Sequence, residues 1–185
     1  MEKIETIIPQ KYTPVFLIFE GITNLTSKDF VNWIIEQNCL KKPPKNLFII
    51  INSDGGDVSD SFSIVDMMNA SNIPVITIGT GFVASGALLI FMNGDTRILT
   101  PNTSIMSHTF SGASDGKFQD LVAAQKDHNL VHNRMLVQYE KCTKLSKKDI
   151  ENKLLTPQDI YLTPEEALKY NICDSIEDIR LDMMQ

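Results

Sequence analysis

Three residues of this chain have the side-chain types that a serine hydrolase uses: Ser85, His108 and Asp159. Ser85 lies among small residues at the start of an apolar run, and His108 ends a short extended segment. A serine hydroxyl becomes a nucleophile when a base takes its proton and an acidic group orients and stabilises that base. The three residues therefore form a candidate Ser–His–Asp triad, which requires that the fold bring them together.

The surroundings of Ser85 support two interpretations. A serine between alanine and glycine is commonly a packing residue, and the Gly-x-Ser-x-Gly elbow of α/β-hydrolases is missing. The predicted place of Ser85, in the first turn of a helix, favours a nucleophile, because free backbone N–H groups there stabilise an oxyanion. The Gly86 N–H is one candidate donor. The Gly55-Gly56 pair, an ordinary turn by itself, is the second, because no Cβ blocks the approach of a substrate.

The other residues of potential chemical interest carry weaker signals. His128 and His132 are four positions apart on one predicted helix face, but no carboxylate or cysteine pattern completes a metal site, so we interpret them as helix surface or subunit contact. Asp159 has an alternative role as a turn residue. An odd, scattered set of cysteines is typical of free thiols in a reducing compartment. These are Cys39, Cys142 and Cys173.

Composition narrows the class of protein. A chain of 185 residues with 22% charged and 43% hydrophobic residues is typical of one globular domain, which we assign to residues 1–185. A net charge of −6 argues against a nucleic-acid partner. The sequence shows neither a signal peptide nor an apolar run long enough to span a bilayer. We therefore expect a cytoplasmic protein with no membrane partner, no metal and no cofactor.

Strands and helices are predicted to alternate along the chain, which indicates an α/β fold with a mainly parallel sheet. In such sheets ligands bind beyond the carboxyl ends of the strands, where the Gly55-Gly56 turn, Ser85 and His108 are predicted to lie. The expected strands are 15–19, 47–51, 74–79, 96–99 and 104–107. The expected helices are 26–37, opened by a capping box at Thr26, then 58–69, 85–92 and 117–142, and two short helices capped by Ser146 and Thr163.

Five ordered segments of the chain resemble motifs of one serine peptidase family, the Clp protease proteolytic subunit (ClpP) family. Together they extend over most of the chain, which makes the resemblance far more specific than any single motif. The segments are Ile51-Asn52-Ser53-Asp54-Gly55-Gly56, Gly81 to Ala87, Pro101 to His108 with its Pro-Asn-x-x-x-Met-x-His pattern, Asp159 to Ala167, and Tyr170 to Ile176.

The resemblance implies a ClpP/crotonase-like spiral of βαβ units with a Ser85–His108–Asp159 triad. It implies oxyanion donors at the backbone N–H groups of Gly56 and Gly86. The region from about 110 to 143 becomes a projecting handle, through which two rings of a homo-oligomer, heptameric by resemblance, stack around a chamber. The implied substrate is a peptide or unfolded protein whose backbone pairs with an extended edge. Residues of that substrate site are Gly55, Ser111, Gly112 and Ala113.

Three departures from the family pattern bear on function. Asp54 replaces the usual proline and Gly86 replaces the usual methionine, so both sides of the implied oxyanion hole differ. Residues 1–14 precede the first predicted strand, where the family carries an axial loop that contacts an ATPase unfoldase, and this short segment argues against such docking. Two other functions stay open at this stage. They are a crotonase-type acyl-CoA enzyme and a non-catalytic ring subunit of a Clp-like complex.

Overall fold

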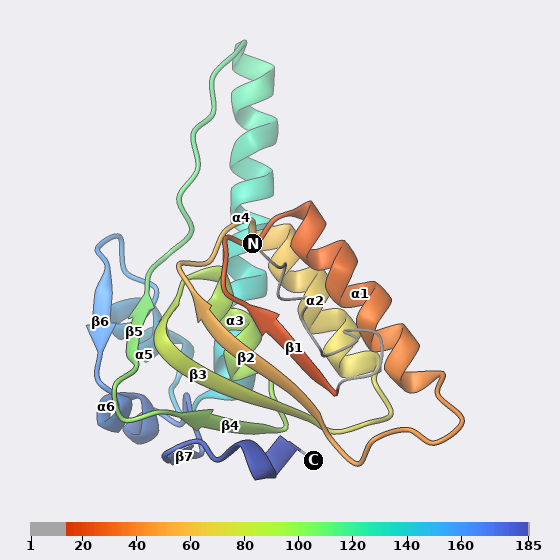
Figure 1. Ribbon diagram of the computed structural model, residues 1–185. Coiled ribbons are helices and arrows are strands. Elements are labelled where there is room, and N and C mark those ends of the chain that lie inside the picture. Colours follow the sequence, from red (N-terminus) through yellow and green to blue (C-terminus); the bar gives the residue numbers. More distant parts are fainter. Residues whose placement is uncertain (1–13, 185) are drawn as a thin grey trace, which may run out of the picture.

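The structure, a computed structural model, describes residues 14–184 (Figure 1). Strands and helices alternate through most of it. The strands are β1 (Val15–Ile18), β2 (Leu47–Ser53), β3 (Val75–Ala84), β4 (Thr96–Leu99), β5 (Ser104–Ser107), β6 (Ile160–Leu162) and β7 (Ser175–Ile176). The helices are α1 (Asn24–Asn38), α2 (Val58–Ala70), α3 (Gly86–Met92), α4 (Phe118–Cys142), α5 (Lys147–Lys153), α6 (Pro164–Lys169) and the 3-10 helix η2 (Leu181–Met184).

The strands form one sheet in the order β1-β2-β3-β4-β7, and β5 and β6 continue it from the far end of β3. Every strand pair is parallel except β5 with β6. β3 is long enough to pair with β4 along its first half and with β5 along its second half. The predicted α/β fold with a mainly parallel sheet is therefore confirmed.

The hydrophobic core lies between this sheet and its helices. β2 is a nearly continuous buried apolar run, which is typical of a parallel strand covered on both faces. Phe16 of β1 packs with Phe30 and Trp33 of α1, with ring centroids 5.2 to 5.5 Å apart. All seven residues of α3 are buried. Since α3 directly follows Ser85, the core fixes the backbone of the candidate nucleophile.

Two element boundaries differ from the prediction for identifiable reasons. Helix α1 is capped by Thr23, whose hydroxyl accepts a hydrogen bond from the Thr26 N–H, so the predicted cap at Thr26 is wrong. Strand β3 does not end at Gly79 but continues to Ala84. It passes through Gly81, whose φ of +58° a glycine adopts easily. The next N–H, of Phe82, donates to the side-chain oxygen of Asn52 at 3.0 Å.

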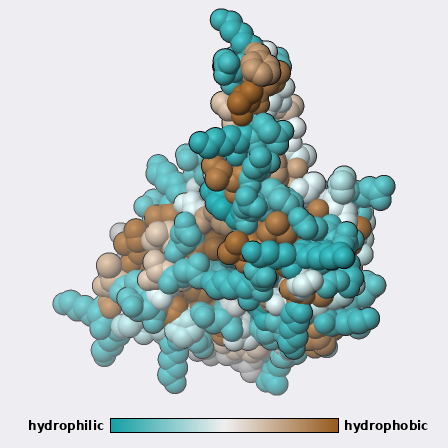
Figure 2. All heavy atoms as spheres, turned by 180° about the vertical axis from the view of Figure 1, so that it is seen from behind, coloured by the Kyte–Doolittle hydropathy of each residue, from teal (hydrophilic) through white to brown (hydrophobic). Residues whose placement is uncertain are grey.

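Helix α4 projects from the rest of the chain, and the segment that precedes it runs alongside (Figure 1). Its C-terminal half is anchored in the core, whereas its N-terminal half carries exposed apolar side chains, visible as hydrophobic surface on the projection (Figure 2). Among the described residues, no helix is both long enough and apolar enough to cross a membrane. The exposed apolar residues of this projecting half are Phe118, Leu121, Val122 and Leu130.

Candidate active site

Ser85 lies in a sharp turn between β3 and α3. Its backbone angles, φ 52° and ψ −121°, are rare for a residue with a Cβ. The Ser85 N–H donates to the Met106 carbonyl, and the Leu88 N–H donates to the Ser85 carbonyl, both at 3.0 Å. The predicted place in the first turn of the helix is wrong, because the helix begins at Gly86 and Ser85 is its N-cap. The strained turn resembles a nucleophile elbow, which presents a hydroxyl at the end of a strand.

The side chain of His108 lies between the other two predicted residues. Its Nε2 is 2.7 Å from Oγ of Ser85, and its Nδ1 is 3.2 Å from Oδ1 of Asp159. The antiparallel pairing of β5 and β6 accounts for the second contact. Ser107 lies opposite Ile160, and the strands run antiparallel. His108, the residue after Ser107, therefore faces Asp159, the residue before Ile160. The structure thus brings together three residues that are far apart in sequence.

A buried hydrogen-bond network supports the strand that carries His108. The Ser107 hydroxyl lies 2.8 Å from the Tyr139 hydroxyl of α4 and donates to the Leu154 carbonyl at 2.8 Å. Burial raises the pKa of Tyr139 to about 12, so its hydroxyl stays neutral in this network. The sequence analysis missed Ser107 and Tyr139 as positioning residues. The available signal was a polar residue, Ser107, at a position where strand alternation predicts burial.

The Gly55-Gly56 turn packs directly against the turn that contains Ser85. Gly55 has a φ of +95°, and a Cβ on it would lie 2.7 Å from the Ala84 carbonyl oxygen and 2.9 Å from Cβ of Ser85. A Cβ on Gly56, φ +154°, would overlap the carbonyl of Ile22. The turn is held by hydrogen bonds from the Ile22 N–H to the Gly55 carbonyl, at 2.8 Å, and from the Asp57 N–H to the Ile22 carbonyl, at 2.9 Å. Glycine is therefore required at both positions.

The first residue of α3, Gly86, packs against the backbone of Gly56. A Cβ on Gly86 would be 3.5 Å from the nitrogen of Gly56 and would overlap the buried hydroxyl of Ser61. This overlap accounts for the glycine at position 86 of this chain. Gly86 is the first residue of α3, so its N–H has no acceptor within the helix. The bonds that pair the Gly55-Gly56 turn with Ile22 use the Gly55 carbonyl and the Asp57 N–H, not the Gly56 N–H.

Comparison with known proteins identifies the family. The family model described as Clp protease matches residues 16–180. The chain belongs to the Clp protease family. It is 30% identical to an ATP-dependent Clp protease proteolytic subunit of Deinococcus radiodurans, over 88% of this chain and 80% of that protein. It is 34% identical to one of Ostreococcus tauri, over 71% and 66%, and 27% identical to subunit 1 of Chlamydia muridarum, over 95% and 93%.

Membership of the Clp protease family confirms two predictions. The resemblance noted in the sequence motifs is correct, and the α/β architecture is that of a ClpP-type fold. The family also makes this chain a serine-type peptidase. The roles of the individual site residues stay predictions. The distances and contacts described above state which atoms each role would involve.

The predicted substrate-binding segment lies beside helix α4 of this Clp protease. Ser111, Gly112 and Ala113 are exposed and pair with no strand among the described residues. Next to them, the ring of Phe110 lies 5.3 Å from that of His128. A Cβ on Gly112 would lie 3.4 Å from His128 Nε2. The segment therefore leans on α4 at His128 and leaves its backbone open to a partner.

His132, the other helix histidine, contacts a carboxylate. Its Nε2 lies 3.5 Å from Oε1 of Glu151 on α5. Each histidine is half-buried against a neighbouring segment of the same chain. Their interpretation as helix surface or subunit contact stays a prediction. Among the described residues, no group of three or more ligand-type side chains gathers around either histidine.

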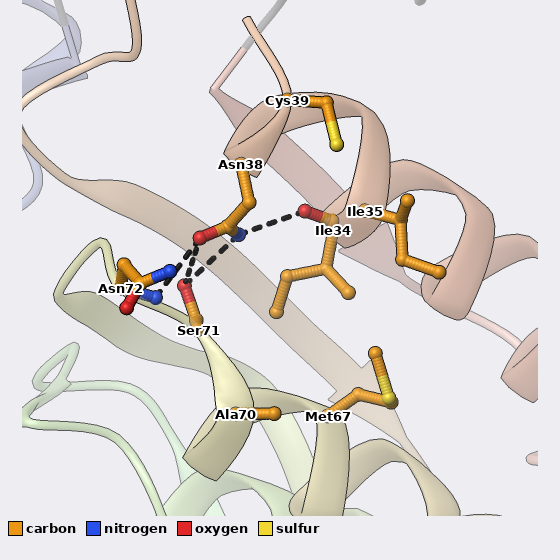
Figure 3. A pocket seen from close by; sticks show the side chains of 8 residues that line it. All are labelled: Ile34, Ile35, Asn38, Cys39, Met67, Ala70, Ser71 and Asn72. Carbon is orange, nitrogen blue, oxygen red and sulfur yellow. Dashed lines mark hydrogen bonds between the residues drawn. The ribbon is translucent and has the colours of Figure 1, made fainter.

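A cavity elsewhere in the fold contains none of the predicted site residues. It has a volume of about 150 Å³ and lies between the C-terminal ends of α1 and α2 (Figure 3). Asn38 closes one side: its Nδ2 donates to the Ile34 carbonyl at 2.8 Å and to the Ser71 hydroxyl at 3.1 Å, and its Oδ1 accepts from the Asn72 N–H at 2.9 Å. We interpret this polar contact as a structural link between the two helices.

Proposed function

We propose that this chain is a serine endopeptidase in which Ser85, His108 and Asp159 act as the catalytic triad. The observation that carries the proposal is the continuous contact from Ser85 Oγ to His108 Nε2, at 2.7 Å, and from His108 Nδ1 to Asp159, at 3.2 Å. A second observation supports it, because Ser85 is held in a strained turn whose hydroxyl makes no capping bond to its own helix. The hydroxyl is thus free to contact the imidazole.

In the proposed mechanism, Ser85 Oγ attacks the carbonyl carbon of the peptide bond while His108 Nε2 takes the hydroxyl proton. Asp159 stabilises the imidazolium that forms. His108 then gives the proton to the leaving amine, so the C–N bond breaks and an acyl-enzyme remains. A water molecule repeats the sequence: His108 takes its proton, the hydroxide attacks the ester carbon, and the proton returns to Ser85 as the carboxylic acid leaves.

We assign the oxyanion hole of this endopeptidase to the backbone N–H groups of Gly56 and Gly86. Both residues lie in backbone segments that adjoin Ser85, and the contact between the two segments, where a Cβ on Gly86 would lie 3.5 Å from the Gly56 nitrogen, supports a shared target. Donors fixed in advance stabilise the negative charge that develops on the carbonyl oxygen, and removal of one such donor costs about a hundredfold or more in rate. The exposed side chain of Asp54, beside this turn, adds a negative charge where the resembled family has proline.

The substrate in this proposal is an extended peptide that pairs with the backbone of Ser111, Gly112 and Ala113. Their exposed, unpaired backbone supports this mode of binding, which reads main-chain groups and selects little by sequence. Gly55 completes the site on the opposite side of Ser85.

The proposed assembly is a pair of stacked rings, heptameric by resemblance, joined through α4. The exposed apolar residues of its projecting half support an interface, because monomeric proteins seldom expose such a cluster. The relatives are named proteolytic subunits of ATP-dependent Clp proteases. These names support an ATPase partner for folded substrates, in place of the expectation drawn from residues 1–14, whereas short peptides are expected to be cleaved by the purified chain alone.

Hydrolysis of short internally quenched peptides by the purified, oligomeric chain tests this proposal. Ser85→Ala should lower kcat/KM by about 10⁴-fold or more, since triad residues act as a unit. Ser59→Ala, at an exposed serine on α2, is the matched control and should keep wild-type activity. Equal activity of Ser85→Ala and wild type would refute the triad. An inactive wild-type chain that forms rings would favour the non-catalytic ring subunit.

A further inference from the structure

An exposed aromatic pair lies on the same sheet face as the candidate triad. The ring of Phe82 on β3 stacks with that of Tyr161 on β6, with centroids 6.5 Å apart and planes 15° from parallel. Tyr161 is 64% exposed and Phe82 is half-buried. Strand β5 lies between β3 and β6. Since adjacent strands are about 4.8 Å apart, the two rings lean toward each other across β5.

Strand register places this pair beside the catalytic groups. Met106 of β5 lies opposite Tyr161 and Ala84, and paired residues point to the same face. Side chains alternate along a strand, so Tyr161 shares a face with Asp159, and Met106 shares one with His108. The opposite face is filled by buried core residues. These are Val83, Ile105, Ser107 and Leu162.

We propose that Phe82, Met106 and Tyr161, here called the aromatic platform, bind an apolar side chain of the substrate on the carboxyl side of the cleaved bond. None of these three side chains belongs to either buried hydrophobic cluster of the sheet, so the core does not need them. Rigid rings offer a large contact area at a small cost in conformational entropy. An apolar side chain that covers the exposed part of Tyr161 would therefore gain binding free energy.

The arrangement around Ser85 determines which side of the cleaved bond meets the platform. The proposed oxyanion donors come from the Gly55-Gly56 turn, which follows β2, and β2 flanks β3 on the side away from β5. His108, which protonates the leaving amine, lies on the β5 side. The chain that carries this amine therefore departs across β5 and β6, where the platform lies.

This inference rests on the proposed function, and the experiment keeps the two apart. The first readout is a fluorophosphonate probe with a small alkyl group, which needs only a reactive Ser85. The second is a set of internally quenched peptides with leucine, phenylalanine, serine or lysine at each of the two positions after the cleaved bond. The variants are Phe82→Ala and Tyr161→Ala, with Tyr161→Phe as the conservative change. Phe19→Ala, an exposed phenylalanine next to β1, is the matched control.

Wild type, Tyr161→Phe and Phe19→Ala should prefer apolar over polar residues at one of these positions. In Phe82→Ala and Tyr161→Ala, kcat/KM for the apolar peptides divided by kcat/KM for the polar peptides should fall by about tenfold or more. This is the usual effect of losing apolar contact in a specificity pocket. The small probe should label all of them equally. An unchanged ratio would overturn the inference. If the preference is unchanged and the oligomeric state differs, the aromatic platform is a subunit interface and not a substrate site. Absence of labelling in wild type would instead refute the proposed function.

Discussion

At the scale of single residues, backbone conformation accounts for much of the candidate site. Ser85, with its positive φ, and the Gly55-Gly56 turn fit together so closely that Cβ atoms are excluded at both glycines. Strain at such a residue costs about 1–3 kcal/mol and persists where the surrounding structure holds it. Here the buried helix α3 and the bond from Ser85 N–H to Met106 hold it.

Gly55→Ala should reduce peptidase activity by about a hundredfold, because the added Cβ would lie 2.7 Å from the Ala84 carbonyl oxygen and displace the nucleophile. Gly21→Ala is the matched control, since its Cβ would meet its nearest atom, the Gly55 carbonyl oxygen, at an ordinary 3.7 Å. The measurement is kcat/KM on a short peptide, with circular dichroism to show that both variants fold. Similar activity in the two variants would contradict the assigned packing.

Ser85→Gly and Ser85→Ala should both be inactive, but they should differ in stability. Glycine adopts a φ of 52° without strain, whereas alanine keeps the Cβ that makes this conformation unfavourable. The glycine variant should be more stable by about 1 kcal/mol, a difference set by the positive φ at this position. Thermal unfolding of the two proteins side by side measures this difference. Equal midpoints would show that the turn at Ser85 is not strained.

At the scale of elements, Arg97 joins segments that are distant in sequence. From β4, its Nη1 donates to the carbonyls of Cys142, at 2.8 Å, and Asn171, at 2.9 Å. Its Nε donates to Oδ2 of Asp174 at 3.0 Å. Burial, the largest single influence, acts to raise the pKa of Asp174, but the hydrogen bonds and charge of Arg97 together hold it below its ordinary value. The base of α4 is thereby tied to β4 and to the turn after α6.

Asp174→Asn should lower the midpoint of thermal unfolding at pH 7 and leave a smaller difference from wild type in acid. A carboxyl whose pKa is lowered by folding stabilises the protein above the unfolded value of about 3.8, and this stabilisation is lost as the pH falls below it. Arg97→Lys should also destabilise, since lysine lacks the fork of donors. Unfolding curves from pH 7 to pH 3 check this. A constant difference between wild type and Asp174→Asn would contradict it.

The elements that could be predicted from the sequence are those with local signals. The buried strand before Asn52 and the helix caps at Ser146 and Thr163 are where residue patterns place them. The extension of β3 through Gly81 was missed, because its support is a side-chain oxygen from another strand, that of Asn52. The sequence motifs suggested the triad residues, but only the pairing of β5 with β3 and with β6 brings their side chains into contact.

The aromatic platform shows why the rest of the site could not be predicted. Phe82 and Tyr161 come from strands that never pair directly, and their rings meet only because β5 lies between them. The residues next to Phe82 and Tyr161 in the sequence contain no pattern that predicts the contact between the two rings. Long-range register of this kind depends on the whole fold, and the network of Ser107 with Tyr139 was missed for the same reason.

At the scale of the whole molecule, the projecting helix α4 should control assembly. Leu121→Glu should dissociate the proposed stacked rings, because it places a charge in the exposed apolar half of α4 that we assign to the interface. Lys126→Glu is the control, a charge change on the same helix at an exposed polar position. Size-exclusion chromatography with light scattering gives the masses. Identical masses for Leu121→Glu and wild type would exclude this part of α4 from the interface.

The most direct test of the account is to map the site of covalent labelling by a fluorophosphonate with mass spectrometry of peptide digests. The account predicts one adduct, on Ser85, in the wild-type chain, and a much slower reaction in His108→Ala, since the imidazole that takes the Ser85 proton lies only 2.7 Å from it. An adduct on another serine, or labelling of Ser85 that proceeds at the same rate without His108, would contradict the central claim.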